Sequence, residues 1–177
     1  MAKRVQPTSA PASPTPAPLR ELLDFTQPRW TWQQAASAIA RCPLPCIVKG
    51  IQSPTDATAA LKAGAVGLYV SNYGGRTIDR TPATIDLLPA IRTAAGPEIP
   101  IILDSGVRRG SDIATAIALG ANAVALGRLT VLGLAADGEN GVRSTLELLK
   151  RELWTTLGHL GRSSIAELTP SIFQARP

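Results

Sequence analysis

Three short segments of the chain combine glycine with cationic or hydroxyl side chains. VSNYGGR at 70–76 and DSGVRRG at 104–110 each place glycines beside an arginine, and Gly127–Arg128 repeats the pairing. Glycines let backbone N–H groups approach an anion, arginine can hold phosphate through two parallel hydrogen bonds, and a following helix N-terminus adds positive potential. Lys49 ends an apolar run and adds a further cation. These residue types predict a binding site for a small anionic molecule.

A structural role for the same cations is the alternative. Arg108 and Arg109 precede a predicted helix, where they could pair with Asp112 or Asp137 instead of a ligand. Lys49 could extend its ammonium into solvent instead of facing an electron-rich ligand. The residue types alone leave both alternatives open.

Alternation of apolar and amphipathic segments predicts the elements that position these loops. Strands are expected at 46–50, 66–72, 99–106 and 121–127, and helices at 31–42, 53–64, 81–96, 109–120 and 141–161. Ser53 and Ser111 are expected to cap two of these helices. Short, continuously apolar strands between helices are typical of a parallel sheet buried on both faces. The sequence therefore predicts an α/β fold of TIM-barrel-type βα units, with the functional loops at the strand carboxyl ends.

The units recognised in the sequence amount to half of such a barrel, because a closed barrel has eight. Residues 1–23, rich in Pro, Ala and Ser, are expected to form a disordered tail and linker, and 24–177 the barrel-like part. A half-barrel alone would expose two sheet edges. Self-association or a partner half-barrel is therefore expected, with a gene fragment or a rearranged open sheet as the alternatives.

Composition argues against several classes of protein. The net charge is +5, but the basic residues are scattered and aromatic residues make up only 4%, so no nucleic-acid partner is expected. No apolar run is long enough to span a membrane. One histidine with Cys42 and Cys46 cannot supply the usual four ligands of a zinc site, so no metal is expected. The thiols are expected to be reduced in a cytoplasmic protein, and His159 to lie at a helix end.

Three stretches together resemble the C-terminal half of the FMN-dependent α-hydroxy-acid dehydrogenase family, which includes glycolate oxidase, lactate oxidase and mandelate dehydrogenase. They are LPCIVKGIQSPTDATAALKAGAVGLYVSNYGGRTIDRTPATIDLLPAI, PIILDSGVRRGSDIATAIALGANAVALGR and GLAADGENGV. The resemblance implies a TIM barrel with FMN at the strand carboxyl ends, to which this chain would contribute strands five to eight. It also implies an oxidoreductase that acts on a small 2-hydroxy acid.

The resemblance further implies roles for individual residues. Lys49 would stabilise the reduced, anionic flavin ring, Ser71 would contact the flavin, and Arg76 would hold the substrate carboxylate. The ribityl and phosphate contacts would come from Asp104, Ser105, Gly106, Val107 and Arg108, and from Gly127 and Arg128.

Tyr73 departs from the family pattern, in which a histidine stands between SN and GGR and takes the hydroxyl proton of the substrate. Imidazole titrates near pH 6.5 and phenol near pH 10, so tyrosine is a poor base at pH 7. Oxidation is expected to be slower by about 10²–10⁴-fold, the contribution of a general base. Three functions stay open: impaired 2-hydroxy-acid oxidation, a non-catalytic half-barrel that at most binds FMN or phosphate, and a different flavin reaction with Tyr73 as the acid. The alternative to a catalytic role is that Tyr73 packs over the site or forms a hydrogen bond with a ligand, without acting as a base.

Overall fold

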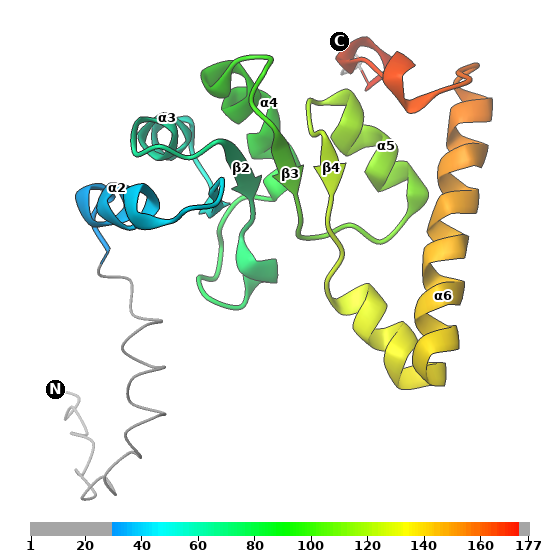
Figure 1. The fold of residues 1–177 in the computed structure, drawn as a ribbon. Helices are drawn as coiled ribbons and strands as arrows, with labels where there is room; N and C mark the ends of the chain where they lie inside the picture. The colour runs from blue at the N-terminus through cyan, green and yellow to red at the C-terminus, as the bar shows by residue number, and fades with distance from the viewer. Residues whose placement is uncertain (1–29, 174–177) are drawn as a thin grey trace, which may run out of the picture. The chain divides into compact units, whose positions relative to one another are not determined.

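The computed structural model describes residues 30–173; the expected tail at 1–23 lies outside them. The chain divides into two units, Met1–Thr31 and Trp32–Pro177. The second unit contains a parallel sheet of four strands in sequential order (Figure 1). These are β1 (Ile47–Ile51), β2 (Gly67–Val70), β3 (Ile101–Leu103) and β4 (Ala123–Val124). The parallel βα organisation expected from the sequence is therefore confirmed.

The helices alternate with the strands along the chain. They are α2 (Trp32–Arg41), α3 (Pro54–Lys62), α4 (Thr84–Ala95), α5 (Gly110–Ala118) and α6 (Arg128–His159), with short 3₁₀ turns η1 (Tyr73–Gly75), η2 (Ile165–Glu167) and η3 (Pro170–Phe173). The strands point their carboxyl ends toward the edge of the sheet where η1 and the start of α6 lie (Figure 1). Among residues 30–173, no helix is long and apolar enough to cross a membrane.

Local capping explains where two of the helices begin. Ser53 accepts a hydrogen bond from the Asp56 N–H at 3.0 Å, as expected, and Pro54 stands in the first turn of α3. The cap expected at Ser111 is wrong. Instead, the Asp112 carboxylate accepts the N–H groups of the two residues before α5, because a carboxylate in the first turn can reach back to them.

The two faces of the sheet differ in burial. Five strand residues are buried against helix residues in one core, namely Ile51, Leu68, Val70, Ile101 and Leu103. The strand positions between them carry Lys49, Tyr69, Ile102 and Ala123, which pair with one another in register across the sheet. Each of these is at least partly exposed, since alternate side chains of a strand point to opposite faces. One face is therefore the core, and the other is open.

The last helix differs from its predicted bounds of 141–161 because it begins at Arg128. The backbone leaves helical geometry at Asp137 and Gly138, where φ is −155° and 49°. The two segments approach each other so closely at Gly133 and Gly141 that a Cβ on either glycine would collide with the other's backbone. These two glycines therefore allow the helix to fold back on itself, which brings its first turn to the strand ends (Figure 1).

Candidate functional site

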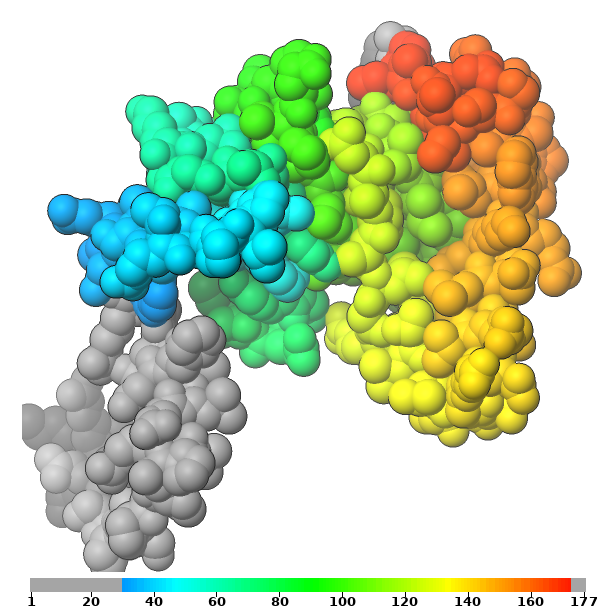
Figure 2. Space-filling model, viewed as in Figure 1, coloured from blue at the N-terminus to red at the C-terminus, as the bar shows by residue number. Residues whose placement is uncertain are grey.

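The carboxyl ends of the strands open into a cavity of about 680 Å³. Its lining contains every predicted site residue except Ser71, which is completely buried beneath it. The lining residues that the sequence reasoning did not single out are Gly74, Ala125, Leu129, Val131 and Leu132. Three of these, Leu129, Val131 and Leu132, lie in the first turns of α6 and form an apolar wall of the cavity. The sequence pattern predicted no helix in this segment, so it did not identify them. Figure 2 shows a hollow between the segment after β2 and the start of α6.

Lys49 lies at the centre of the polar contacts in the cavity. Its Nζ is 2.7 Å from Asp104 Oδ2, donates to Ser71 Oγ at 2.8 Å, and lies 3.9 Å from the centre of the Tyr69 ring. The register of β1 with β2 shifts between Lys49 and Ile51. Because Ser71 follows β2 and Asp104 follows β3, the ammonium is held at the carboxyl ends of these two strands. The alternative of a Lys49 side chain extended freely into solvent therefore does not hold.

The Asp104 carboxylate is the anionic partner of this ammonium. Its burial alone would raise its pKa, but hydrogen bonds from Lys49, Ser71 and Ser105 outweigh burial and hold the pKa below its usual value. Burial, followed by the nearby Asp104 charge, raises the pKa of Tyr69. The site therefore keeps a charged pair next to a neutral phenol at neutral pH.

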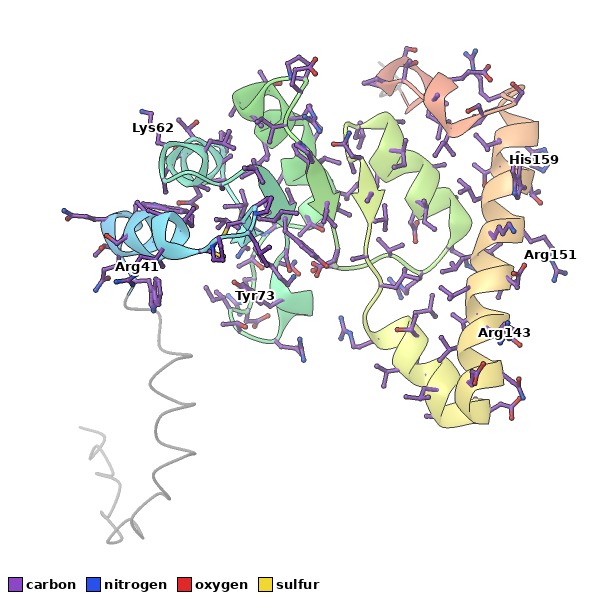
Figure 3. The ribbon with its side chains drawn as sticks, viewed as in Figure 1. Arg41, Lys62, Tyr73, Arg143, Arg151 and His159 are labelled. Atoms are coloured by element: carbon purple, nitrogen blue, oxygen red, sulfur yellow. The ribbon has the colours of Figure 1, made fainter. Side chains whose placement is uncertain are left out.

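Tyr73 lies in the loop after β2 (Figure 3) and packs over the end of β1. Its φ of 57° is left-handed, and its N–H donates to Ser71 Oγ at 3.1 Å. The phenol hydroxyl lies against Gly50, where a Cβ would collide with it. The ring centre is 5.5 Å from Lys49 Nζ. Tyr73 thus lies beside the ammonium in the position expected of a residue that packs over the site.

Three arginines face the cavity without a carboxylate partner within residues 30–173: Arg76, Arg108 and Arg128. Arg76 donates from Nε to the Tyr73 carbonyl at 3.0 Å, and Arg128 donates from Nη2 to the Gly74 carbonyl at 3.1 Å. With Lys49 and Asp104, the lining carries four cations and one carboxylate, a formal charge of 4 − 1 = +3. Such a cavity attracts an anion.

The structural alternative holds for Arg109 alone. Its Nη1 is 3.0 Å from Glu152 Oε1 of α6, whereas Asp112 accepts only its backbone N–H and Asp137 does not pair with its guanidinium. Glu152 also accepts the Gly110 N–H at 2.8 Å. The amide of Gly110, the first residue of α5, and the amides of the two residues before it are therefore occupied by carboxylates. Because Glu152 is 42 residues from Gly110, no local pattern of residues predicts this contact.

His159 is the last residue of α6, as expected, and lies far along that helix from the loop that carries Tyr73 (Figure 3). Cys42 and Cys46 are free thiols. In the part of the chain that the structure describes, no group of three His, Cys, Asp or Glu side chains could hold a metal ion.

Comparison with known proteins identifies relatives of this arrangement. A family model described as FMN-dependent dehydrogenase matches residues 4–175. A 2-hydroxyacid oxidase of Dictyostelium discoideum is 43% identical over 82% of this chain and 37% of its own length. An L-lactate oxidase of Alicycliphilus denitrificans is 40% identical over 92% of this chain and 45% of its own length.

A solved structure extends the match to the fold. A monotopic membrane protein, (S)-mandelate dehydrogenase, superposes with a TM-score of 0.80 at 38% identity, covering 86% of this chain and 41% of that one. The chain therefore spans less than half the length of the relatives it matches. Its four parallel strands correspond to part of the TIM barrel of these relatives.

Proposed function

Because the chain belongs to the FMN-dependent dehydrogenase family, we propose that it works as an FMN-binding oxidoreductase of the (S)-2-hydroxy-acid dehydrogenase or oxidase type. The observation that carries the proposal is the Lys49 ammonium, held by Asp104 and Ser71 at the floor of a cationic cavity. A fixed cation with preorganised hydrogen bonds stabilises negative charge that develops during a reaction.

FMN is the cofactor of this family, and the residues present suit it. Arg108 and Arg128 face the cavity and have no carboxylate partner among the described residues, so both are available to a phosphate. Gly106 and Gly127 have open space where a Cβ would stand. The residues proposed to line the cofactor are Lys49, Ser71, Asp104, Ser105, Gly106, Val107, Arg108, Gly127 and Arg128.

The remaining side chains suggest how the substrate would be held. When bound, FMN supplies the acceptor for the substrate's α-hydrogen. Arg76 is anchored through Nε, which leaves its terminal nitrogens to grip the carboxylate of a small 2-hydroxy acid. Tyr73, beside Lys49, stands where the family's proton acceptor is expected.

A neutral phenol accepts a proton poorly at pH 7, so we propose that oxidation by this site is impaired. The packing of Tyr73 over Gly50 supports a second candidate, a half-barrel that binds FMN or phosphate without catalysis. A reaction in which the phenol donates a proton is a third possibility for the same site. The free thiols Cys42 and Cys46 are in keeping with a cytoplasmic location, which we also propose.

The Tyr73→His variant tests whether the remaining site is competent. With flavin bound, we expect oxidation of a 2-hydroxy acid such as lactate to rise by about 10²–10⁴-fold, the contribution of a general base. The measurement is flavin bleaching under anaerobic conditions, with Tyr73→Phe as the matched control. A flavin-loaded Tyr73→His sample that gains nothing over Tyr73→Phe would contradict the oxidoreductase proposal and favour the non-catalytic half-barrel.

We further propose that the open sheet face is covered by another half-barrel, either a second copy of the chain or a separate polypeptide. Ile47 and Lys49, two residues apart on β1, both lie on that face, and Ile47 is 47% exposed. β1 and β4 are the outer strands of the sheet, and unpaired outer strands favour association.

A further inference from the structure

Ser105 connects the two loops that bound the cavity. Its Oγ donates to Asp104 Oδ1 at 2.7 Å and accepts the Gly74 N–H at 3.2 Å. Gly74 belongs to the loop after β2, whereas Ser105 and Asp104 follow β3. One hydroxyl therefore joins segments that are 31 residues apart in the sequence.

The same two loops are joined a second time through Lys49. The Lys49 ammonium bridges the other oxygen of Asp104, Oδ2, to Ser71 Oγ. Ser71 Oγ also accepts the Tyr73 N–H at 3.1 Å. Tyr73 and Gly74 are neighbours in the chain, so these contacts close a ring of hydrogen bonds. Both oxygens of the Asp104 carboxylate belong to the ring, one held by Lys49 and the other by Ser105.

Ser105 occupies a backbone conformation that disfavours a side chain. Its φ is 75°, in the left-handed region that glycine adopts freely. Buried Thr84 holds this turn, because its hydroxyl lies 2.6 Å from the Asp104 carbonyl and 3.2 Å from the Ser105 carbonyl. A strained residue that is locked in place and makes specific contacts within a site points to a role in that site.

We propose that Ser105 is a positioning residue. Through Asp104 it fixes the orientation of the Lys49 ammonium, and through Gly74 it fixes the loop that carries Tyr73 and Arg76. The hydrogen-bonded ring stands independently of any ligand. Its consequence for flavin binding rests on the proposed function.

Two substitutions separate the hydroxyl from the backbone strain. Ser105→Gly and Ser105→Ala both remove the hydroxyl, but only glycine also relieves the left-handed backbone. Ser111→Ala, at an exposed position of α5, is the control. In the flavin-free chain, ¹³C NMR of the Asp104 carboxyl should show its pKa raised in both Ser105 variants and unchanged in the control, because the lost hydroxyl stabilised the charged form.

FMN affinity, measured by quenching of flavin fluorescence, should fall by about fivefold to tenfold in both Ser105 variants. This is the size of effect expected when one hydrogen bond that orients the Lys49–Asp104 pair is lost. A residue that merely shapes the turn would be replaced by glycine without loss. Unchanged Asp104 titration in both variants would therefore overturn the proposal. If the titration moves while the unaltered chain binds no FMN, the ring stands and the proposed function fails.

Discussion

At the level of single residues, the cations in and beside the cavity divide into those with a carboxylate partner and those without one. Lys49 and Arg109 each pair with a carboxylate, whereas Arg108 and Arg128 pair with none among the described residues. Both side chains are exposed at the cavity wall, and an arginine without a carboxylate partner keeps its hydrogen-bond donors available to an anion. We therefore propose that Arg108 and Arg128 bind the phosphate of FMN.

The variants Arg108→Ala and Arg128→Ala test this assignment. Each should weaken FMN binding by about 10–150-fold, because a hydrogen bond to a charged group contributes about 1.5–3 kcal/mol. Arg143→Ala is the matched control, since Arg143 pairs only with Glu139 on the surface of α6 (Figure 3). Titration by flavin fluorescence measures the affinities. Equal losses in all three variants would show a general charge effect instead of a phosphate site.

Among the elements, the crossing of α5 and α6 supports the loop after β3. Gly110 is buried, and a Cβ there would collide with the backbone of Leu153 and Glu152 in α6. Glu152 accepts the Gly110 N–H and pairs with Arg109. Because Arg108 precedes these residues directly, the packing of two helices fixes where the proposed phosphate ligand lies.

The substitution Gly110→Ala should therefore force α5 away from α6. We expect a loss of about 1–3 kcal/mol in the free energy of unfolding, the usual cost of overpacking. Gly158→Ala is the opposite control, because its Cβ would meet open space within α6 and alanine favours a helix by about 0.5–1 kcal/mol. Urea denaturation compares the two. A Gly110→Ala chain as stable as Gly158→Ala would refute the close crossing.

The same elements show how far sequence reasoning reaches. Alternating apolar strands and helices predicted the parallel sheet and placed Lys49 and Arg108 at one end of it, because the carboxyl ends of parallel strands share an edge. The short-range cap at Ser53 was also confirmed. The Glu152 contact and the folded-back start of α6 could not be predicted, since each depends on packing between segments that are distant in the sequence or rich in glycine.

For the molecule as a whole, the main question is which residues cover the open face of the sheet. Lys49, Tyr69, Ile102 and Ala123 form a continuous row there, and in a closed barrel such a row is covered by residues from the other strands. The substrate side chain would meet that missing surface. The proposed second half-barrel would therefore affect both assembly and substrate choice.

Replacement of Ile47 by lysine tests the role of this face in assembly. Ile47 is 47% exposed at the start of β1, so a charge there should prevent association and change the free energy of unfolding by no more than about 0.5 kcal/mol. Leu148→Lys, 52% exposed on α6, is the control. Sedimentation velocity reports the masses. If Ile47→Lys and the unaltered chain sediment alike, the open face is not the association surface.

The central claim is that this half-barrel contains a working FMN site. The most direct test is titration of the purified, unaltered chain with FMN, followed by flavin absorption, with mass by light scattering on the same sample. We expect saturable binding of one FMN per chain, in particles heavier than the 18.5 kDa chain. A sample that is folded by circular dichroism and leaves added FMN free would contradict it.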